Sequence, residues 1–291
     1  MLIDFLKLCR PHQYLKNAFV LVGLIFGGDG SLGLFLRAAV AFVAFSAIAS
    51  AVYIGNDILD VEADRRHPTK RNRPIARGAV SVGAAWRLAA ALALFALALA
   101  AALSPLAALL IFAYALLNVG YSWRWKQVVI VDVFIISAGF MLRLLTGTLG
   151  LGIPPSTWLL LCGFMLTLFL GFAKRRSEML ALEGAETERA ASTRRVLDDY
   201  SPAMIEQFMS ITAACAVISY SLYTVAPETI ARQHTQKLIL TVPFVVYGIF
   251  RYLYLLHRER RGSDTARDLL TDPHMLFACA GWAALTLAVR L

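Results

Sequence analysis

Three aspartates follow a long apolar stretch of the chain at a spacing that suits metal binding. Asp57, Asp60 and Asp64 stand at positions i, i+3 and i+7. On a helix with about 100° per residue, this spacing places the three carboxylates within roughly 60° of one another. Carboxylates on one face repel each other unless a cation neutralises them, and hard oxygen ligands suit Mg²⁺. The spacing therefore predicts a magnesium site formed by these three residues, with Glu62 pointing away.

A dense run of basic residues comes directly after the aspartates, at residues 65–74. Guanidinium and ammonium groups bind phosphate oxygens well. We therefore expect Lys70, Arg71 and Arg73 to bind phosphate beside the metal, which predicts a site for a Mg²⁺-bound diphosphate. The alternative is a cytoplasmic loop in which the acids merely offset the bases, but charge balance does not require the spacing of the three aspartates.

The elements that must position these residues are membrane helices. The chain has 291 residues, of which 59% are hydrophobic and 16% charged, whereas soluble domains have about 45–50% apolar and about 25% charged residues. Several apolar stretches approach the roughly 20 residues that a helix needs to cross a bilayer. We predict an all-α polytopic membrane helix bundle, one domain over residues 1–291, with about nine transmembrane helices. They are expected at 14–28, 33–54, 83–103, 105–122, 129–149, 157–173, 204–225, 237–256 and 274–290.

Lysine and arginine are concentrated in alternate loops, at 55–82, 123–128, 174–203 and 257–273. By the positive-inside rule, this bias predicts a cytoplasmic N-terminus and an outer C-terminus. The polar cap and the active site then lie on the cytoplasmic side of the inner (cell) membrane. The net charge of +9 is in this view a topological signature and a match to anionic membrane lipids. No soluble nucleic-acid module accompanies the basic residues, so we expect no nucleic-acid partner.

Two charged residues fall within the fifth predicted helix. Asp132 and Arg143 are eleven residues apart, close to three helical turns, so they share nearly one face. A charge at the bilayer centre costs at least about 2.5–3.5 kcal/mol, and such residues usually line a polar cavity. We expect Asp132 to face a cavity near Tyr121 and Lys126. For Arg143 the alternative of snorkelling to the outer interface stays open.

Three further basic residues are candidates at the inner face. Lys174 and Arg175 end the sixth predicted helix, where basic residues are also ordinary positive-inside usage. Lys16 lies where the first predicted helix enters the membrane, and its residue type alone favours a headgroup anchor. The four cysteines are scattered without paired spacing, which indicates core residues and neither a metal site nor a disulfide framework.

The run from Asn56 to Asp64, Asn-Asp-x-x-Asp-x-x-x-Asp, resembles the first aspartate motif of the UbiA superfamily of intramembrane prenyltransferases. The resemblance covers essentially the whole chain and implies a nine-helix bundle with a cytoplasmic polar cap. Typical members carry a second motif, Asp-x-x-x-Asp, before helix five. Here Asp132 is its only acid, because Val128 and Ile136 occupy the positions four residues before and after it.

Other landmarks resemble the decaprenyl-phosphate phosphoribosyltransferases of that superfamily. They are Arg10 to Asn17, His67-Pro68-Thr69-Lys70-Arg71-x-Arg73, Tyr121 with Lys126, Arg143, Lys174-Arg175-x-x-Glu178, Arg194 and Arg195 with Tyr200, and Asp272. The His-Pro-Thr-Lys-Arg run discriminates most strongly. The chain departs from the pattern at Ala173, where glycine is expected, and at Arg124 and Trp125, in a loop expected to be less bulky.

This resemblance implies Mg²⁺-dependent transfer of 5-phosphoribose from 5-phosphoribosyl 1-diphosphate to a polyprenyl (decaprenyl-type) phosphate. Diphosphate is released, and the product serves lipid-linked pentose (arabinose donor) and cell-envelope biosynthesis. Asp57, Asp60 and Asp64 would hold the Mg²⁺. Asp132 would position a ribose hydroxyl or assist the metal, and the sequence does not choose between these roles. Substrate binding would fall to Lys16, Asn56, Lys70, Arg71, Arg73, Tyr121, Lys126, Arg143, Lys174 and Arg175.

Two other functions stay open at this point. A UbiA-type prenyltransferase would use the same metal site to move a prenyl group from a prenyl diphosphate to an aromatic or other small acceptor. The missing second aspartate and the run from His67 to Arg73 count against it. A carrier would more naturally place its acids at the bilayer midplane than at one mouth. A homo-oligomer is compatible with the sequence, although no heptad or other interface signal establishes one.

Overall fold

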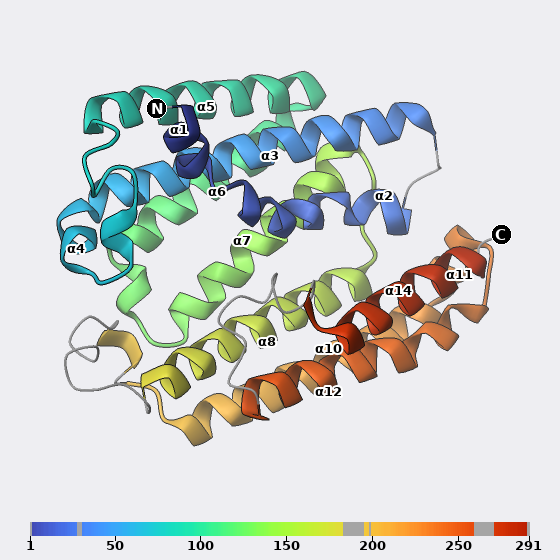
Figure 1. Ribbon diagram of the computed structural model, residues 1–291. Helices are drawn as coiled ribbons and strands as arrows, with labels where there is room; N and C mark the ends of the chain where they lie inside the picture. Colours follow the sequence, from blue (N-terminus) through green and yellow to red (C-terminus); the bar gives the residue numbers. More distant parts are fainter. Residues whose placement is uncertain (1, 28–30, 183–194, 198, 259–270, 290–291) are drawn as a thin grey trace. The chain divides into compact units, whose positions relative to one another are not determined.

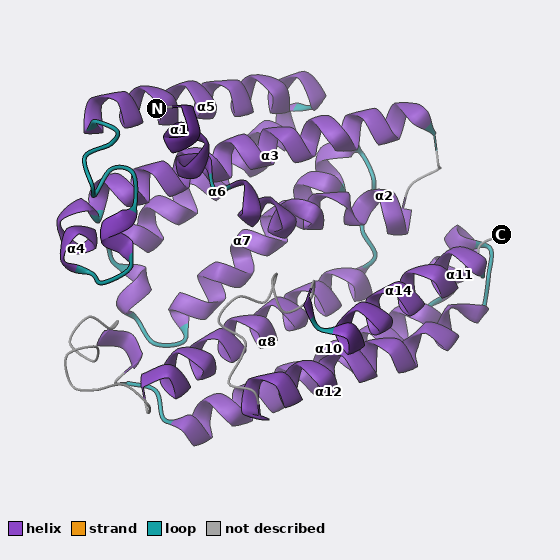
Figure 2. Cartoon of the chain, in the orientation of Figure 1, coloured by secondary structure: helices purple, strands orange, loops and turns teal. Residues whose placement is uncertain are grey.

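The structure is a computed structural model that describes residues 2–27, 31–182, 195–197, 199–258 and 271–289. Every regular element within these ranges is helical (Figure 2), which confirms the all-α class. The longer helices are α3 (Leu32–Leu59), α5 (Val82–Leu103), α6 (Pro105–Trp123), α7 (Val131–Gly147), α8 (Thr157–Leu182), α10 (Pro202–Val225), α12 (Val242–Arg258) and α14 (Pro273–Ala288). Shorter ones are α1 (Leu2–Cys9), η1 (Pro11–Leu21), α2 (Val22–Gly27), α4 (Val61–Arg66), η2 (Lys70–Asn72), η3 (Trp125–Gln127), η4 (Leu149–Leu151), η5 (Arg195–Leu197), α11 (Pro227–Gln233) and η6 (Lys237–Thr241).

Seven helical segments in the described ranges are long and apolar enough to cross a membrane by length and composition. They agree with seven of the predicted spans, and the shorter α14 falls on an eighth. The remaining span, 14–28, differs, because η1 is a 3-10 helix that is followed by the six-residue α2. At about 2.0 Å per residue a 3-10 helix is longer than an α-helix of the same residue number. Residues 11–27 can therefore extend over roughly 30 Å.

Capping residues fix where many of the helices begin. The side chains of Ser31, Ser81, Ser104, Ser201 and Asp272 each accept a hydrogen bond from the backbone N–H three residues later, at the start of α3, α5, α6, α10 and α14. Such caps satisfy a backbone donor that the first helical turn leaves open. Proline occupies the first position of α6, α10 and α14, where no N–H is needed.

The chain divides into two compact units, which we describe separately. Unit 1 comprises Met1–Trp125 with Leu142–Pro154, and unit 2 comprises Lys126–Met141 with Pro155–Leu291. Helix α7 is therefore divided, with residues 131–141 in unit 2 and residues 142–147 in unit 1. Whether residues 1–291 form a single domain stays a prediction.

Unit 1 is built around α3, which packs against α5, α6 and η1 (Figure 1). Its interior is rich in alanine, and small side chains allow membrane helices to approach closely. The buried alanines of this core include Ala38, Ala41, Ala44, Ala96, Ala100 and Ala107. Close packing of this kind brings polar groups on neighbouring helices within hydrogen-bonding distance.

The closest approach in unit 1 joins η1 and α2 to the end of α7. A Cβ added to Gly147 would lie 1.7 Å from the carbonyl oxygen of Val20, and one added to Gly23 would lie 2.0 Å from the carbonyl oxygen of Gly147. Only glycine fits at these two positions without displacing backbone. This contact places Asn17 of η1 beside Arg143 of α7.

Unit 2 is a helical bundle in which α8 packs along α10, and α12 packs against α10 and α14 (Figure 1). Its core contains Phe169, Ile205, Met209, Tyr252 and Leu255, all nearly fully buried. The first turns of α7 join this core through Val133, whose Cγ1 would lie 2.6 Å from a Cβ added to Gly171 of α8. Asp132 is thereby held inside unit 2.

We expect Gly147→Ala to destabilise the protein, because the new methyl group would collide with the Val20 carbonyl. Overpacking against backbone costs on the order of 3 kcal/mol, which should lower Tm by roughly 5–10 °C. Thermal unfolding in detergent measures this. Gly33→Ala is the matched control, since nothing lies within 4 Å of the added Cβ there. Equal Tm values for both variants would contradict the close approach.

Candidate active site

The first aspartate motif lies at the junction of two helices. Helix α3 ends at Leu59, and α4 begins at Val61 after Asp60, which has φ −92° and ψ 6°. The prediction that one uninterrupted helix carries the three aspartates is therefore wrong, because the helix is broken at Asp60. The backbone N–H of Asp60 still bonds to the carbonyl of Asn56, and that of Asp64 to the carbonyl of Asp60. These hydrogen bonds connect the end of α3 to the start of α4 through Asp60.

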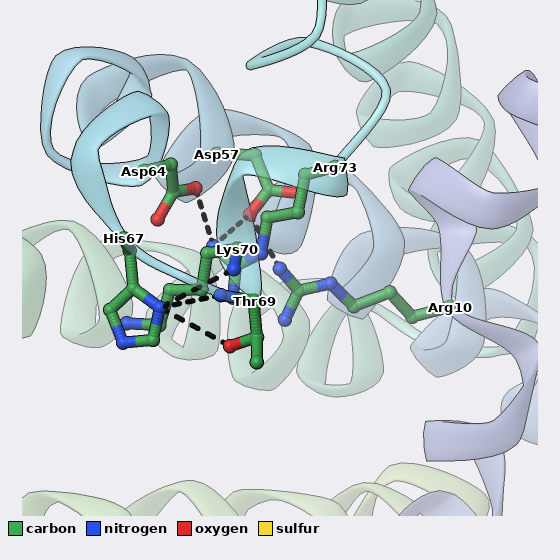
Figure 3. A network of polar contacts seen from close by, with 7 residues as sticks. All are labelled: Arg10, Asp57, Asp64, His67, Thr69, Lys70 and Arg73. Carbon is green, nitrogen blue, oxygen red and sulfur yellow. Dashed lines mark hydrogen bonds and ion pairs between the residues drawn. The ribbon is translucent and has the colours of Figure 1, made fainter.

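Asp57 and Asp64 converge on a single guanidinium nitrogen, as Figure 3 shows. Nη1 of Arg73 lies 2.9 Å from Oδ1 of Asp57 and 2.7 Å from Oδ2 of Asp64. Both carboxylates are buried, with 3% of each side chain exposed. Nη2 of Arg10 lies 2.5 Å from the same oxygen of Asp57. Two buried anions are thus balanced by two partly buried cations, as charges in apolar surroundings require.

The expected three-aspartate metal site is assembled here as a pair of carboxylates. Asp60 lies half-buried at the helix junction, and within the described ranges no three Asp, Glu, His or Cys side chains come together as a metal site. Mg²⁺ is commonly bound by one or two carboxylates together with substrate phosphates. Asp57 and Asp64 fit this pattern, because one cationic atom, Nη1 of Arg73, lies within 3 Å of an oxygen of each carboxylate.

The basic run after the motif folds back over it. Nδ1 of His67 accepts hydrogen bonds from the backbone N–H groups of Thr69 and Lys70, at 3.3 and 3.4 Å (Figure 3). Burial and the nearby Lys70 ammonium group lower the pKa of His67, which favours the neutral, accepting ring. The turn leads the chain back so that Arg73 reaches the carboxylates. Lys70 and Arg71 are exposed on the outside of the same loop.

Arg143 is buried inside unit 1 with 4% of its surface exposed. Its Nε donates to Oδ1 of Asn17 at 2.9 Å, and its Nη2 donates to the hydroxyl of Tyr114 at 3.0 Å. The guanidinium carbon also lies 5.0 Å from the ring centroid of Phe45 and 4.7 Å from that of Tyr114. This burial rules out the alternative in which Arg143 snorkels to the outer interface.

A row of polar contacts continues from Asn17 along α3. Nδ2 of Asn17 donates to Oγ of Ser46 at 3.1 Å, and the hydroxyl of Tyr14 lies 2.9 Å from Oγ of Ser50. Ser46, Ser50 and Asp57 share one face of α3, because their spacing follows whole helical turns. The polar groups of α3 in unit 1 thus lie on one side of the helix, with the apolar Ile54 between Ser50 and Asp57.

Asn56, Tyr121 and Lys16 are the remaining predicted residues of unit 1. Oδ1 of Asn56 accepts a hydrogen bond from Oγ of Ser122 at 2.6 Å, which ties α3 to α6. Tyr121 and Lys16 are half-buried. Ser122 was not expected from the sequence, because a serine among apolar residues carries no signal of its partner.

Asp132 and Arg175 form the buried polar centre of unit 2, and both are fully buried. Oδ1 of Asp132 accepts from the hydroxyl of Tyr200 at 2.8 Å, and Oδ2 lies 3.2 Å from Nε of Arg175. Arg175 also pairs with Glu178. Arg175 was expected to bind substrate, and in the structure it is paired with these two protein carboxylates.

Lys126 and Lys174, the remaining predicted residues of unit 2, are half-buried. Tyr200 was noticed only through the resemblance, because its partner Asp132 is distant in the sequence. Arg194 lies outside the described residues.

Asp272 caps α14 and pairs with Arg251 of α12. Its carboxylate accepts from Nη2 and Nε of Arg251 at 2.7 and 3.1 Å and from the backbone N–H of Met275 at 2.9 Å. The hydrogen bond from Arg251 is the main cause that lowers the pKa of Asp272 from 3.8 to about 2. Asp272 therefore links the start of α14 to α12.

Residues 17–286 match the sequence profile of the UbiA prenyltransferase family. The chain belongs to this family. The UbiA-type bundle expected from the aspartate motif is thereby confirmed, and the seven apolar helices indicate an integral membrane protein.

Among curated proteins, the chain is 38% identical over 227 residues to a decaprenyl-phosphate phosphoribosyltransferase of Corynebacterium glutamicum, covering 75% of this chain and 66% of the relative. The chain thus spans slightly less than two thirds of that relative. The protein of the same name from Mycobacterium tuberculosis H37Rv is 33% identical over 251 residues, covering 84% and 81%. Nodulation protein NoeC of Azorhizobium caulinodans is 28% identical over 284 residues, covering 97% and 91%.

Solved structures of the UbiA family share the fold. A UbiA homologue from Archaeoglobus fulgidus bound to DMAPP and Mg²⁺ superposes with a TM-score of 0.74 at 19% identity, covering 99% of each chain. A structure of digeranylgeranylglyceryl phosphate synthase gives a TM-score of 0.68 at 18% identity, covering 99% of this chain and 98% of the other. At these identities the likeness shows the fold alone.

We expect the Arg251–Asp272 pair to make stability pH-dependent in the acid range. Because the pKa in the folded protein is about 2, below the ordinary 3.8, the stabilisation is fully present above the ordinary value and is lost as the pH falls through about 2. Asp272→Asn should remove this part of the pH dependence and lower Tm at pH 7. Thermal unfolding in detergent from pH 7 to pH 2 measures both effects. Parallel curves for the variant and the wild type would contradict the assignment.

Proposed function

We propose that this UbiA-family protein transfers 5-phosphoribose from 5-phosphoribosyl 1-diphosphate to the phosphate of a polyprenyl phosphate, with Mg²⁺, and releases diphosphate. The observation that carries the proposal is that the carboxylates of Asp57 and Asp64 converge on one cationic atom, Nη1 of Arg73, in a basic loop. The names of the relatives from Corynebacterium and Mycobacterium support the choice of substrates. A decaprenyl-type acceptor and a place in lipid-linked pentose and cell-envelope biosynthesis follow from the same resemblance.

In this proposal Asp57 and Asp64 would hold Mg²⁺, assisted by Asp60 at the helix junction. When bound, the metal neutralises the diphosphate leaving group. Arg73 lies at the same carboxylates, and Lys70 and Arg71 are exposed beside it, so this loop is suited to bind the phosphates of a soluble donor. We place it on the cytoplasmic side of the inner membrane, in line with the positive-inside bias.

The acceptor phosphate is already an anion, so its attack needs no strong general base. Catalysis then depends on holding the phosphate in line with C1 of the ribose, whose bond to the diphosphate breaks with oxocarbenium character. A single displacement predicts inversion at C1. Arg143 and Lys16 of unit 1 are our candidates for the acceptor phosphate, since Arg143 contacts Asn17 of η1 and Lys16 directly precedes Asn17 in the chain. The polyprenyl chain would extend into the membrane lipid.

The first test follows ribose-labelled 5-phosphoribosyl 1-diphosphate into the organic phase, with purified protein, Mg²⁺ and polyprenyl phosphate in detergent. We expect transfer by the wild type and a loss of at least about 100-fold in Asp57→Asn, because one of the proposed metal-binding carboxylates is removed. Glu62→Gln is the matched control, since Glu62 is an exposed acid of the same motif that pairs with Arg65. It should keep activity within about threefold.

Prenyl transfer to a small aromatic acceptor, measured in parallel with a prenyl diphosphate, tests the alternative UbiA-type activity. Label from the prenyl group in the acceptor, together with no ribose label in lipid, would overturn the proposal. Binding of polyprenyl phosphate without any turnover would instead favour a carrier.

A second test separates Arg73 from Arg71. The guanidinium of Arg73 contacts the carboxylate oxygens that Mg²⁺ would use, so it competes with the metal. We expect Arg73→Gln to lower the half-saturating concentration of Mn²⁺, measured by titration calorimetry without substrate, by roughly fivefold. Arg71→Gln, which alters an exposed residue of the same loop, should leave it unchanged. Weaker Mn²⁺ binding in Arg73→Gln would show that Arg73 supports the metal site and does not compete.

A further inference from the structure

The turn that precedes α7 holds a strained residue. Ile130 has φ +68°, a left-handed conformation that is unfavourable for a β-branched side chain. Such a conformation persists only where surrounding contacts hold it in place. Ile130 is partly exposed, with 36% of its surface accessible, so apolar packing around its side chain does not explain the strain.

One hydroxyl group adds a side-chain contact to the backbone hydrogen bonds that close this turn, which run from Val131 to Val129 and from Asp132 to Val128. The hydroxyl of Tyr200 accepts a hydrogen bond from the backbone N–H of Ile130 at 2.6 Å and donates to Oδ1 of Asp132 at 2.8 Å. Tyr200 is 4% exposed, and burial raises the pKa of its hydroxyl, so the hydroxyl stays a neutral donor. A single side chain therefore contacts both a strained backbone and a buried carboxylate, although it is 70 and 68 residues away.

Asp132 has one hydrogen-bonded and one ion-paired oxygen within unit 2, and the ion-paired Oδ2 accepts no hydrogen bond from the described residues. Oδ1 accepts from Tyr200, and Oδ2 faces Nε of Arg175 at 3.2 Å. Asp132 and Arg175 are both fully buried, and the position four residues before Asp132 is Val128 and the one four residues after is Ile136. A lone, fully buried and paired carboxylate is better suited to hold protein structure than to bind a hydrated cation.

We propose that Tyr200 is a positioning residue that holds the turn at Ile130 and the carboxylate of Asp132, and that Asp132 anchors this turn instead of serving as a metal ligand. The turn begins after η3, which carries Lys126, so its position sets where the ammonium group of Lys126 lies. The effect on turnover rests on the proposed function and on the expectation from the family resemblance that Lys126 binds substrate, whereas the structural part rests on neither.

The structural part is tested by hydrogen exchange of the full-length protein in detergent. Tyr200→Phe removes only the hydroxyl group, so amides of residues 128–134 should exchange at least tenfold faster. Tyr220→Phe is the matched control, because it also removes a buried hydroxyl with two partners in unit 2, Thr241 and Trp282. Tyr220→Phe should leave residues 128–134 unchanged. Unchanged exchange there in Tyr200→Phe would overturn the proposal.

The role of Asp132 is tested by binding of Mn²⁺ alone. Asp132→Asn keeps an oxygen that can accept from Tyr200 but removes the carboxylate charge. We expect the Mn²⁺ affinity to stay within twofold of the wild type, whereas Asp57→Asn should weaken it at least tenfold. A tenfold loss in Asp132→Asn would identify Asp132 as a ligand and overturn the proposal.

Turnover provides the third measurement. Tyr200→Phe should raise KM for 5-phosphoribosyl 1-diphosphate about tenfold with kcat within threefold. Ile130→Gly in the same protein should restore KM to within threefold of the wild type, because glycine adopts positive φ without a tether. A loss of kcat that Ile130→Gly does not rescue would overturn positioning through this turn. If the wild type transfers no ribose, the proposed function fails, and hydrogen exchange and Mn²⁺ binding still decide this inference.

Discussion

The shared contact of Asp57 and Asp64 with Arg73 is the interaction on which the candidate site depends. The two carboxylates come from different helices, and the guanidinium comes from a loop that folds back over both. Removing one partner of a buried ion pair leaves an uncompensated charge, which costs about 3–5 kcal/mol. The break between α3 and α4, the turn at His67 and the position of Arg73 are therefore interdependent. A metal ion that binds Asp57 and Asp64 would enter a site in which arginine side chains already neutralise these carboxylates.

The same constraint recurs around the two charged residues of α7. Arg143 is surrounded by an amide oxygen, a hydroxyl and two aromatic rings, and Asp132 by a hydroxyl and a guanidinium. Each arrangement requires helices that approach closely, which the alanines of unit 1 and the glycines at Gly147 and Gly171 permit. Packing of small residues is thus a condition for placing charge within an apolar protein.

Much of the fold was predictable from the sequence, because run length and hydropathy report membrane helices directly. The first aspartate motif was predictable for a similar reason, since its spacing is local. Which basic residue pairs with the aspartates was not predictable from the sequence. Lys70, Arg71 and Arg73 are equivalent in the sequence, and only the turn at His67 selects Arg73 for the carboxylates. Likewise, Tyr200 could not be linked to Asp132 by any local pattern, because the contact spans 68 residues.

The 3-10 conformation of η1 also lay beyond sequence analysis, and it has a consequence for local stability. With three residues per turn, Tyr14, Asn17 and Val20 form one straight row, and each contacts a neighbouring helix in unit 1. In an α-helix the first and last of these would be about 120° apart, and the row could not form. Long 3-10 helices are rarely stable alone, so η1 persists only while docked. Local opening of unit 1 should therefore begin at η1, and Arg143 would lose its Asn17 partner in the same event.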